Sequence, residues 1–202
     1  MSRAVRFAPL ILLLLLLAGL AWRLATPATT NVSSKLLGKP VPVFALPAAL
    51  PLKPSVTSAN LVSGRPRILN IFASWCVPCV AESRVLIQLQ KSGVHIDGIA
   101  VRDRSEDVAD FLARNGDPYD RIGSDQQSRV QIALGSSGVP ESFVIDGKGI
   151  LRYEGAIDSV ASTDQDDIKE ATNYVASAVD AVMAGKKVDP TVTQSYGCGV
   201  KY

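Results

Sequence analysis

The sequence predicts an α/β fold in which helices flank a central mixed β-sheet. Apolar runs typical of strands alternate with helical segments, and a turn-linked hairpin follows them. A Cys-x-x-Cys pair also stands where an apolar run gives way to the first helix of this region. Strand–helix alternation indicates parallel strands joined by crossovers, and a hairpin adds antiparallel strands. The two patterns together predict a mixed sheet.

The expected elements follow one another between residues 39 and 183. An edge strand at 39–44 would suit its prolines, and 48–63 reads as a loop. The other elements are, in order, a strand at 67–73, a helix at 76–91 stopped by Gly93, a strand at 95–101, a helix at 106–114, a short helix at 127–134, a hairpin of strands 142–145 and 150–154 around the turn 146–149, and a helix at 164–183 with Thr163 as its N-cap. His95, at the start of a strand, is expected to be structural.

Charge argues against a nucleic-acid partner. The chain of 202 residues has 21 Lys and Arg against 19 Asp and Glu. Three of the cations, Arg3, Arg6 and Arg23, belong to the N-terminal apolar segment, so the rest of the chain is nearly neutral. Such a balance lacks the basic surface that nucleic acids or anionic membranes attract.

The N-terminal segment predicts export. Residues 7–24 are almost wholly apolar, and Arg3 and Arg6 before them place the N-terminus in the cytoplasm. We expect an uncleaved inner-membrane anchor at 1–24, because Trp22 and Arg23 suit a membrane interface better than a cleavage site; a removed signal peptide is the alternative. The expected domains are the anchor, a linker at 25–38, a catalytic domain at 39–186 in the periplasm, and a tail at 187–202.

The sequence Cys76-Val77-Pro78-Cys79 predicts thiol–disulfide exchange. Its spacing at a helix start holds two sulfurs within bonding reach, and helix N–H groups stabilise the first thiolate. A zinc site would need four ligands, and haem attachment would need a His where Val80 stands. A structural disulfide is the other alternative, although a bridge closing so short a loop stabilises weakly. No metal, flavin or nucleotide is expected.

With these elements in place, the chain resembles the CcmG/DsbE group of thioredoxin-fold proteins, the membrane-tethered thiol–disulfide oxidoreductases of cytochrome c maturation. The matching stretches are Leu37-Gly38-Lys39-Pro40-Val41-Pro42, Leu69-Asn70, Trp75-Cys76-Val77-Pro78-Cys79 with Ala81-Glu82, Gly116-Asp117-Pro118-Tyr119, and Gly138-Val139-Pro140-Glu141-Ser142-Phe143-Val144-Ile145-Asp146-Gly147. The resemblance covers roughly residues 36 to 160 and implies a thioredoxin fold.

The resemblance also implies roles for single residues. Cys76 would attack and Cys79 would resolve, while a cis Pro140 would let the Val139 backbone pair with a substrate strand. Trp75 would be a contact residue at the edge of the site. Acidic groups would lie near it at three positions, namely Glu82, Glu141 and Asp158. Asn70 stands where thioredoxins carry a buried Asp, so the role of accepting the proton of Cys79 passes to Glu82, Glu141 or water.

Carboxylates near Cys76 should keep its pKa moderate and so favour a reductant over an oxidant. For Glu82 the alternative is an exposed position on the helix surface. Cys198, in the tail, is either an incidental free thiol or an accessible one that forms an intermolecular bond.

The resemblance implies a reductase for the haem-binding cysteines of apocytochrome c, or for a cytochrome c maturation protein, that is recharged by a membrane electron donor of the DsbD/CcdA type. Two alternatives stay open. One is a general periplasmic disulfide reductase of the TlpA/ResA kind. The other is a non-enzymatic binding module with a structural disulfide.

Overall fold

The computed structural model describes residues 3–25, 35–136, 138–160 and 170–199. The chain divides into two compact units, Met1–Val32 and Ser33–Tyr202. The first unit contains one helix, α1 (Arg3–Ala25), which includes Pro9. Among the described residues, no helix combines the length and the apolar character that a membrane crossing requires. The expected membrane anchor is therefore not confirmed.

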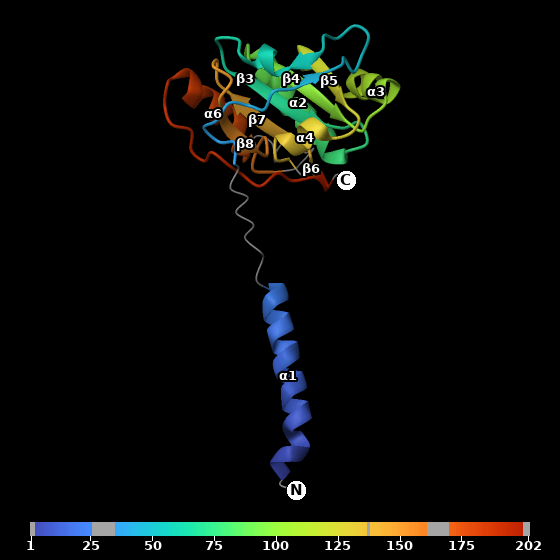
Figure 1. Cartoon of the computed structure of the whole chain (residues 1–202), viewed down its shortest axis with the longest axis vertical. Coiled ribbons are helices and arrows are strands. Elements are labelled where there is room, and N and C mark those ends of the chain that lie inside the picture. The colour runs from blue at the N-terminus through green and yellow to red at the C-terminus, as the bar shows by residue number, and fades with distance from the viewer. Residues whose placement is uncertain (1–2, 26–34, 137, 161–169, 200–202) are drawn as a thin grey trace. The chain divides into compact units, whose positions relative to one another are not determined.

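The second unit is built on a five-stranded mixed sheet in the order β5-β4-β3-β7-β8 (Figure 1). The strands are β3 (Arg67–Phe72), β4 (His95–Val101), β5 (Arg121–Asp125), β7 (Glu141–Ile145) and β8 (Leu151–Gly155). Strands β3, β4 and β5 are parallel, whereas β7 and β8 are antiparallel to their neighbours. Every residue of β3 is buried, as expected of a central strand covered on both faces.

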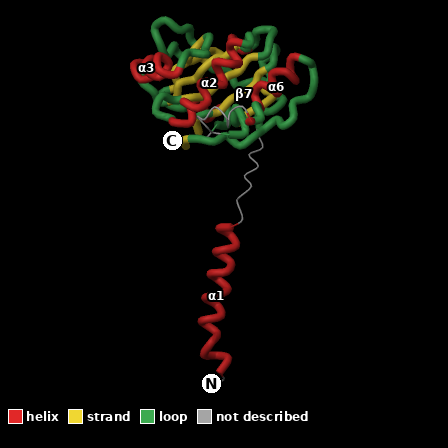
Figure 2. The backbone as a smooth tube through the Cα atoms, turned by 180° about the vertical axis from the view of Figure 1, so that it is seen from behind, coloured by secondary structure: helices red, strands yellow, loops and turns green. Residues whose placement is uncertain are grey.

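Helices connect the parallel strands. The helix α2 (Val77–Lys91) joins β3 to β4, and α3 (Ser105–Asn115) joins β4 to β5. Two further helices follow, α4 (Arg129–Ala133) and α6 (Tyr174–Met183), and the helices surround the strands (Figure 2). Gly93, just after α2, has a φ of 88°, which confirms the predicted stop. The predicted α/β class with a thioredoxin-like mixed sheet is confirmed.

Three predicted elements differ in the structure. The strand expected at 39–44 is reduced to a bridge between Pro40 and Ile150. Instead, β1 (Ala45–Leu46) pairs with β2 (Val56–Thr57), and the 3-10 helix η1 (Ser58–Leu61) follows within the expected loop. The strand β5 was not predicted. Finally, α6 begins after an Asn173 cap, whose side chain accepts from the Ala176 amide, while Thr163 and the first turn expected after it lie outside the described residues.

An ionic cluster lies at the end of the sheet opposite Cys76. Arg67, 5 % exposed, donates to Asp97 at 2.8 and 2.9 Å and to Asp120 at 2.9 Å. Asp97 is fully buried, and Arg121 approaches it at 3.4 Å. His95 pairs with Asp120 at 2.8 Å, which agrees with the structural role expected for it.

Replacing Arg67 with Met is expected to destabilise the domain by about 3–5 kcal/mol, because it leaves the buried Asp97 carboxylate without its bidentate partner. Chemical denaturation measures this change. Arg104→Met is the matched control, since Arg104 is 75 % exposed in its ion pairs with Glu106 and Asp107, and a change within about 0.5 kcal/mol is expected. Equal stability of the two variants would contradict the interpretation.

Candidate active site

The two cysteines lie where β3 ends and α2 begins. Cys76 is the N-cap residue of α2, with extended backbone angles (φ −97°, ψ 112°), and Cys79 lies in the first turn. Pro78, in that turn, costs little because the first N–H groups of a helix have no partner inside the helix. Both cysteines are free, and their exposed fractions are 0 % and 2 %.

The two sulfurs differ strongly in acidity. A hydrogen bond from the Cys79 thiol stabilises the Cys76 thiolate and lowers the pKa of Cys76 to about 6. Burial, together with the neighbouring Cys76, raises the pKa of Cys79 well above its usual range. Cys76 is therefore suited to attack, whereas Cys79 stays protonated until its surroundings change.

A loop with a cis peptide between Val139 and Pro140 lies against Cys76. The Cys76 sulfur lies 3.2 Å from the Val139 carbonyl oxygen and donates to it in the thiol form. The side chains of Gln131 and Ser136 both donate to the Gly138 carbonyl, at 3.1 and 3.0 Å, and hold the loop in place. The structure thus brings Cys76, Cys79 and Val139 together. Neither Gln131 nor Ser136 belongs to a motif that the sequence analysis could have recognised.

A polar network lies beneath the cysteines. Glu82 is 3 % exposed, so it does not occupy the exposed helix position considered as an alternative. Its Oε1 accepts from Asn70 Nδ2 at 3.1 Å and from Ser142 Oγ at 3.0 Å. Tyr119 in turn donates to Asn70 Oδ1 at 2.7 Å. Asn70 therefore has no carboxyl group of its own, but it holds the carboxyl group of Glu82 in position.

Burial raises the pKa of Glu82 to about 8. The hydrogen bonds from Ser142 and Asn70 lower this pKa in part, whereas the neighbouring Asp158 raises it further. Glu82 is accordingly neutral at pH 7, and the repulsion expected from a carboxylate at this position is absent there. When ionised, the same carboxyl group raises the pKa of Cys79. Of the predicted acids, Glu82 thus lies near the sulfurs, and Asp158 lies near Glu82.

The other two predicted contact residues lie at the margin. Glu141 follows Pro140, but its electrostatic neighbours are Ser136 and Glu154, and burial raises its pKa to about 7. Its side chain points away from the face of Ser142, because neighbouring residues of a strand face opposite sides. Trp75 is 46 % exposed and offers an apolar surface beside Cys76.

The C-terminal segment reaches the same loop. Strand β9 (Cys198–Gly199) pairs antiparallel with β6 (Gly138–Val139), so Cys198 lies opposite Val139. Burial and the neighbouring Cys76 raise the pKa of Cys198. The sequence predicted either an incidental free thiol or an intermolecular bond for Cys198, and it left open whether this residue approaches Cys76.

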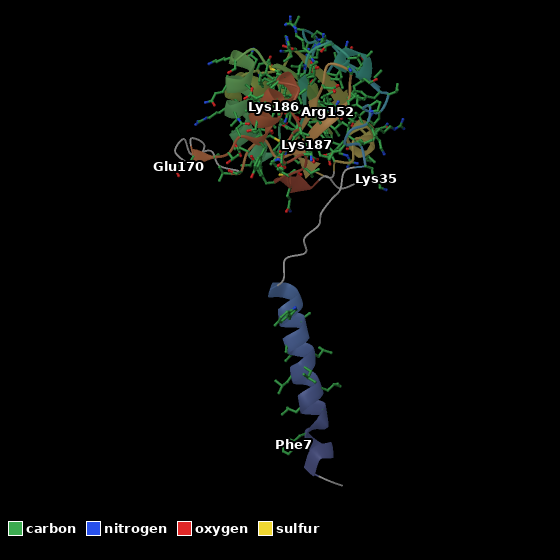
Figure 3. All side chains as sticks on the ribbon, turned by 90° about the vertical axis from the view of Figure 1, so that its left-hand side faces the viewer. Phe7, Lys35, Arg152, Glu170, Lys186 and Lys187 are labelled. Carbon is green, nitrogen blue, oxygen red and sulfur yellow. The ribbon has the colours of Figure 1, made fainter. Side chains whose placement is uncertain are left out.

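Other candidate sites are less informative. In the described part of the chain, no group of three or more His, Cys, Asp and Glu side chains is placed to hold a metal ion. A cavity of about 1360 Å³ lies near the start of β4, away from the cysteines, and His95 is among its lining residues. Arg152, Lys186 and Lys187, which also line it, are labelled in Figure 3.

Several known proteins are similar to this chain in sequence. The Redoxin family matches residues 36–173. The thiol:disulfide interchange protein DsbE of Tatumella citrea is 36 % identical over 177 residues, which cover 86 % of this chain and 96 % of that protein. DsbE of Escherichia coli (strain K12) is 36 % identical over 173 residues, or 84 % and 94 % of the two chains.

Structural similarity agrees on the fold. The crystal structure of a secreted Mycobacterium tuberculosis disulfide oxidoreductase homologous to E. coli DsbE aligns with a TM-score of 0.53 and 19 % identity, over 68 % of this chain and 95 % of that chain. The chain belongs to the Redoxin family and, within it, to the DsbE-type thiol:disulfide interchange proteins, and it is a thiol:disulfide oxidoreductase.

Proposed function

We propose that the chain is a periplasmic reductase that reduces the disulfide between the haem-binding cysteines of apocytochrome c, or of a protein that delivers it. The observation that carries the proposal is the contrast between two adjacent sulfurs. Cys76 has a pKa lowered to about 6 and lies against a substrate loop, while Cys79 is buried behind it with a raised pKa. The DsbE relatives support disulfide exchange as the reaction.

In the proposed reaction, the Cys76 thiolate attacks one sulfur of the substrate disulfide and expels the other as a thiolate. The Cys79 thiol then loses its proton and attacks Cys76, which releases the substrate dithiol and leaves a Cys76–Cys79 disulfide. Glu82 can accept the proton of Cys79 only in its ionised form, which its pKa of about 8 confines to a minor fraction at pH 7; we assign the proton to this form, because Glu82 is buried near Cys79 and Asn70 cannot accept a proton. The sulfurs carry both electrons, so the reaction needs no further cofactor.

The pKa of Cys76 indicates that the cysteine pair donates electrons to its substrate. A pKa of about 6 lies well above the value near 3.5 that makes DsbA a strong oxidant. The reduced form is accordingly less stabilised, which favours donating electrons. We infer that a membrane dithiol donor of the DsbD/CcdA type returns the pair to the reduced state.

The N-terminal segment supports a location outside the cytoplasm. Arg3 and Arg6 before an apolar run are typical of export, and we place the second unit in the periplasm. Spheroplasts of the native host should expose the domain to added protease. Carbonate extraction of the membranes then tests whether the chain is held there by α1.

Replacing Cys79 with Ser is expected to trap the substrate. Without a resolving thiol, the mixed disulfide at Cys76 accumulates and can be isolated from the native host, and mass spectrometry identifies the captured protein. Apocytochromes c, or a maturation protein with its own thiol pair, are expected. The double variant with Cys76 and Cys79 both replaced by Ser is the control and should capture nothing.

Other outcomes of the same experiment decide between the alternatives. A broad set of unrelated exported proteins would replace the dedicated role with that of a general reductase. Complete absence of an adduct at Cys76 would contradict the reductase and leave a binding module with a structural disulfide.

A further inference from the structure

The segment from residue 191 to 199 is fixed along the domain before it reaches the cysteines. The Glu154 amide donates to the Thr191 carbonyl, and the Thr193 amide donates to the Glu154 carbonyl, both at 3.1 Å. The hydroxyl oxygen of Thr193 also accepts from the Ala156 amide at 3.0 Å. The segment therefore extends the pairing beyond β8 and has a defined course (the red C-terminal segment in Figure 1).

The end of the segment is fitted to the active-site loop. Tyr196 donates to Asp158 Oδ1 at 2.6 Å. Gly197 then passes so close to the loop that a Cβ atom there would overlap the Val139 carbonyl oxygen, and its φ of 152° also disfavours other residues. Cys198 follows, opposite Val139 in the β6–β9 pair.

This segment occupies the place proposed for the substrate. A substrate would pair its backbone with Val139 and bring a sulfur to Cys76. Residues 198–199 pair with this backbone, and Cys198 lies opposite Val139, whose carbonyl oxygen is 3.2 Å from the Cys76 sulfur. Cys76 and Val139 are only 0 % and 1 % exposed, whereas attacking cysteines normally need partial access to solvent. A protein disulfide therefore reaches Cys76 only after the tail has moved.

We propose that residues 191–199 compete with the substrate for the position beside Val139 and that Cys198 is a third redox cysteine. In the oxidised protein Cys198 exchanges into the active-site disulfide, and the new bond holds this segment, the tail, in the position of the substrate. The tail's competition with substrate rests on the proposed function. The cysteine exchange rests on the strand pairing that places Cys198 opposite Val139 and on the contact of Val139 with Cys76.

The exchange needs no oxidant. The Cys198 thiolate attacks the Cys76 sulfur of the Cys76–Cys79 disulfide, a Cys76–Cys198 bond forms, and the bond to Cys79 breaks. Cys79 leaves as a thiolate and takes up the proton that Cys198 has given off. One disulfide replaces another, and the same dithiol donor that reduces the original pair reduces the new one by two electrons.

Disulfide mapping tests the exchange. The full-length protein is oxidised, quenched in acid, alkylated with N-ethylmaleimide and digested with trypsin, and the monomer is analysed. Trypsin separates peptide 68–84, which carries Cys76 and Cys79, from peptide 188–201, which carries Cys198. We expect a fraction of molecules with the two peptides joined through Cys76 and with Cys79 alkylated. Alkylation of Cys198 in every oxidised molecule would overturn the exchange.

A matched pair of glycine variants tests the competition. Gly197→Val would displace the tail, whereas Gly199→Val adds the same side chain where no atom lies within 4 Å. If the tail is seated about nine-tenths of the time, its displacement raises the alkylation rate of Cys76 in the reduced protein about tenfold. The Gly199→Val protein should react like the unmodified one. Equal rates in both variants, with equal thermal unfolding midpoints, would overturn the competition.

The same proteins separate this inference from the proposed function. Reduction of a disulfide-bonded Cys-x-x-Cys-His peptide should be faster with Gly197→Val than with Gly199→Val. It is possible to find the Cys76–Cys198 cross-link and the difference in alkylation rate although neither protein reduces the peptide. In that case the proposed substrate is wrong, and the tail still occupies the position beside Val139.

Discussion

Cys76→Ser is expected to reduce the rate of disulfide reduction to the uncatalysed background, a loss on the order of a thousandfold or more. A pKa of about 6 means that about nine-tenths of the Cys76 thiol is ionised at pH 7, whereas an ordinary cysteine is ionised by only a few per cent. A serine hydroxyl in the same position offers no comparable nucleophile. Reduction of a disulfide-bonded peptide, followed by mass spectrometry, measures the loss.

The pH dependence of the unmodified protein belongs to the same prediction. Under single-turnover conditions the rate of attack should rise with pH and reach half its maximum at about pH 6. Val77→Ala is a suitable control, because Val77 is 74 % exposed beside the site and contributes no titrating group. Substantial activity in Cys76→Ser would contradict the assignment of the attacking sulfur.

Glu82→Gln is expected to change the pH dependence of stability more than any other single substitution considered for this chain. Burial raises the pKa of Glu82 from 4.5 to about 8 in the folded protein. Between these values the folded state holds one proton more than the unfolded state, so the free energy of unfolding falls as pH rises. The slope is about 1.4 kcal/mol per pH unit, or about 4 kcal/mol between pH 5 and pH 8.

Denaturation of the reduced protein at several pH values measures this effect as the difference between the unmodified protein and Glu82→Gln. Glu141, whose pKa is raised to about 7, contributes with the same sign to both proteins and cancels. Glu106→Gln, on the exposed surface of α3, is the matched control and should follow the unmodified protein. A difference that does not change with pH would contradict the buried, protonated state of Glu82.

The elements that sequence reasoning predicted are those whose residues carry a local pattern. The run at 67–73 is apolar enough to read as a buried strand, and Gly93 marks the end of α2. Strand β5 has no such pattern, since Gly123 and Ser124 lie in its middle. A Cβ on Gly123 would meet Leu46 at 2.8 Å, so this strand is defined by tertiary packing that the local sequence does not record.

The residues of the active site also differ in whether a local sequence pattern predicts them. The cysteines and the loop at Pro140 are close to recognisable motifs, and the structure has the cis peptide that the resemblance implies. A two-residue strand brings Cys198 to the Val139 loop beside Cys76, although Cys198 and Cys76 are more than a hundred positions apart in the sequence. No periodicity marks so short a strand, and only the pairing with Val139 reveals it.

The equilibrium between the reduced protein and a disulfide-bonded Cys-x-x-Cys-His peptide tests the central claim most directly. The amounts of oxidised and reduced protein and of oxidised and reduced peptide give the reduction potential of the cysteine pair. In the Cys198→Ser variant the Cys76–Cys79 couple is measured alone. We predict that electrons pass to the peptide and that the potential lies below about −180 mV. A potential near −120 mV, with the peptide still oxidised, would show that the chain is an oxidant and would contradict the proposed reductase.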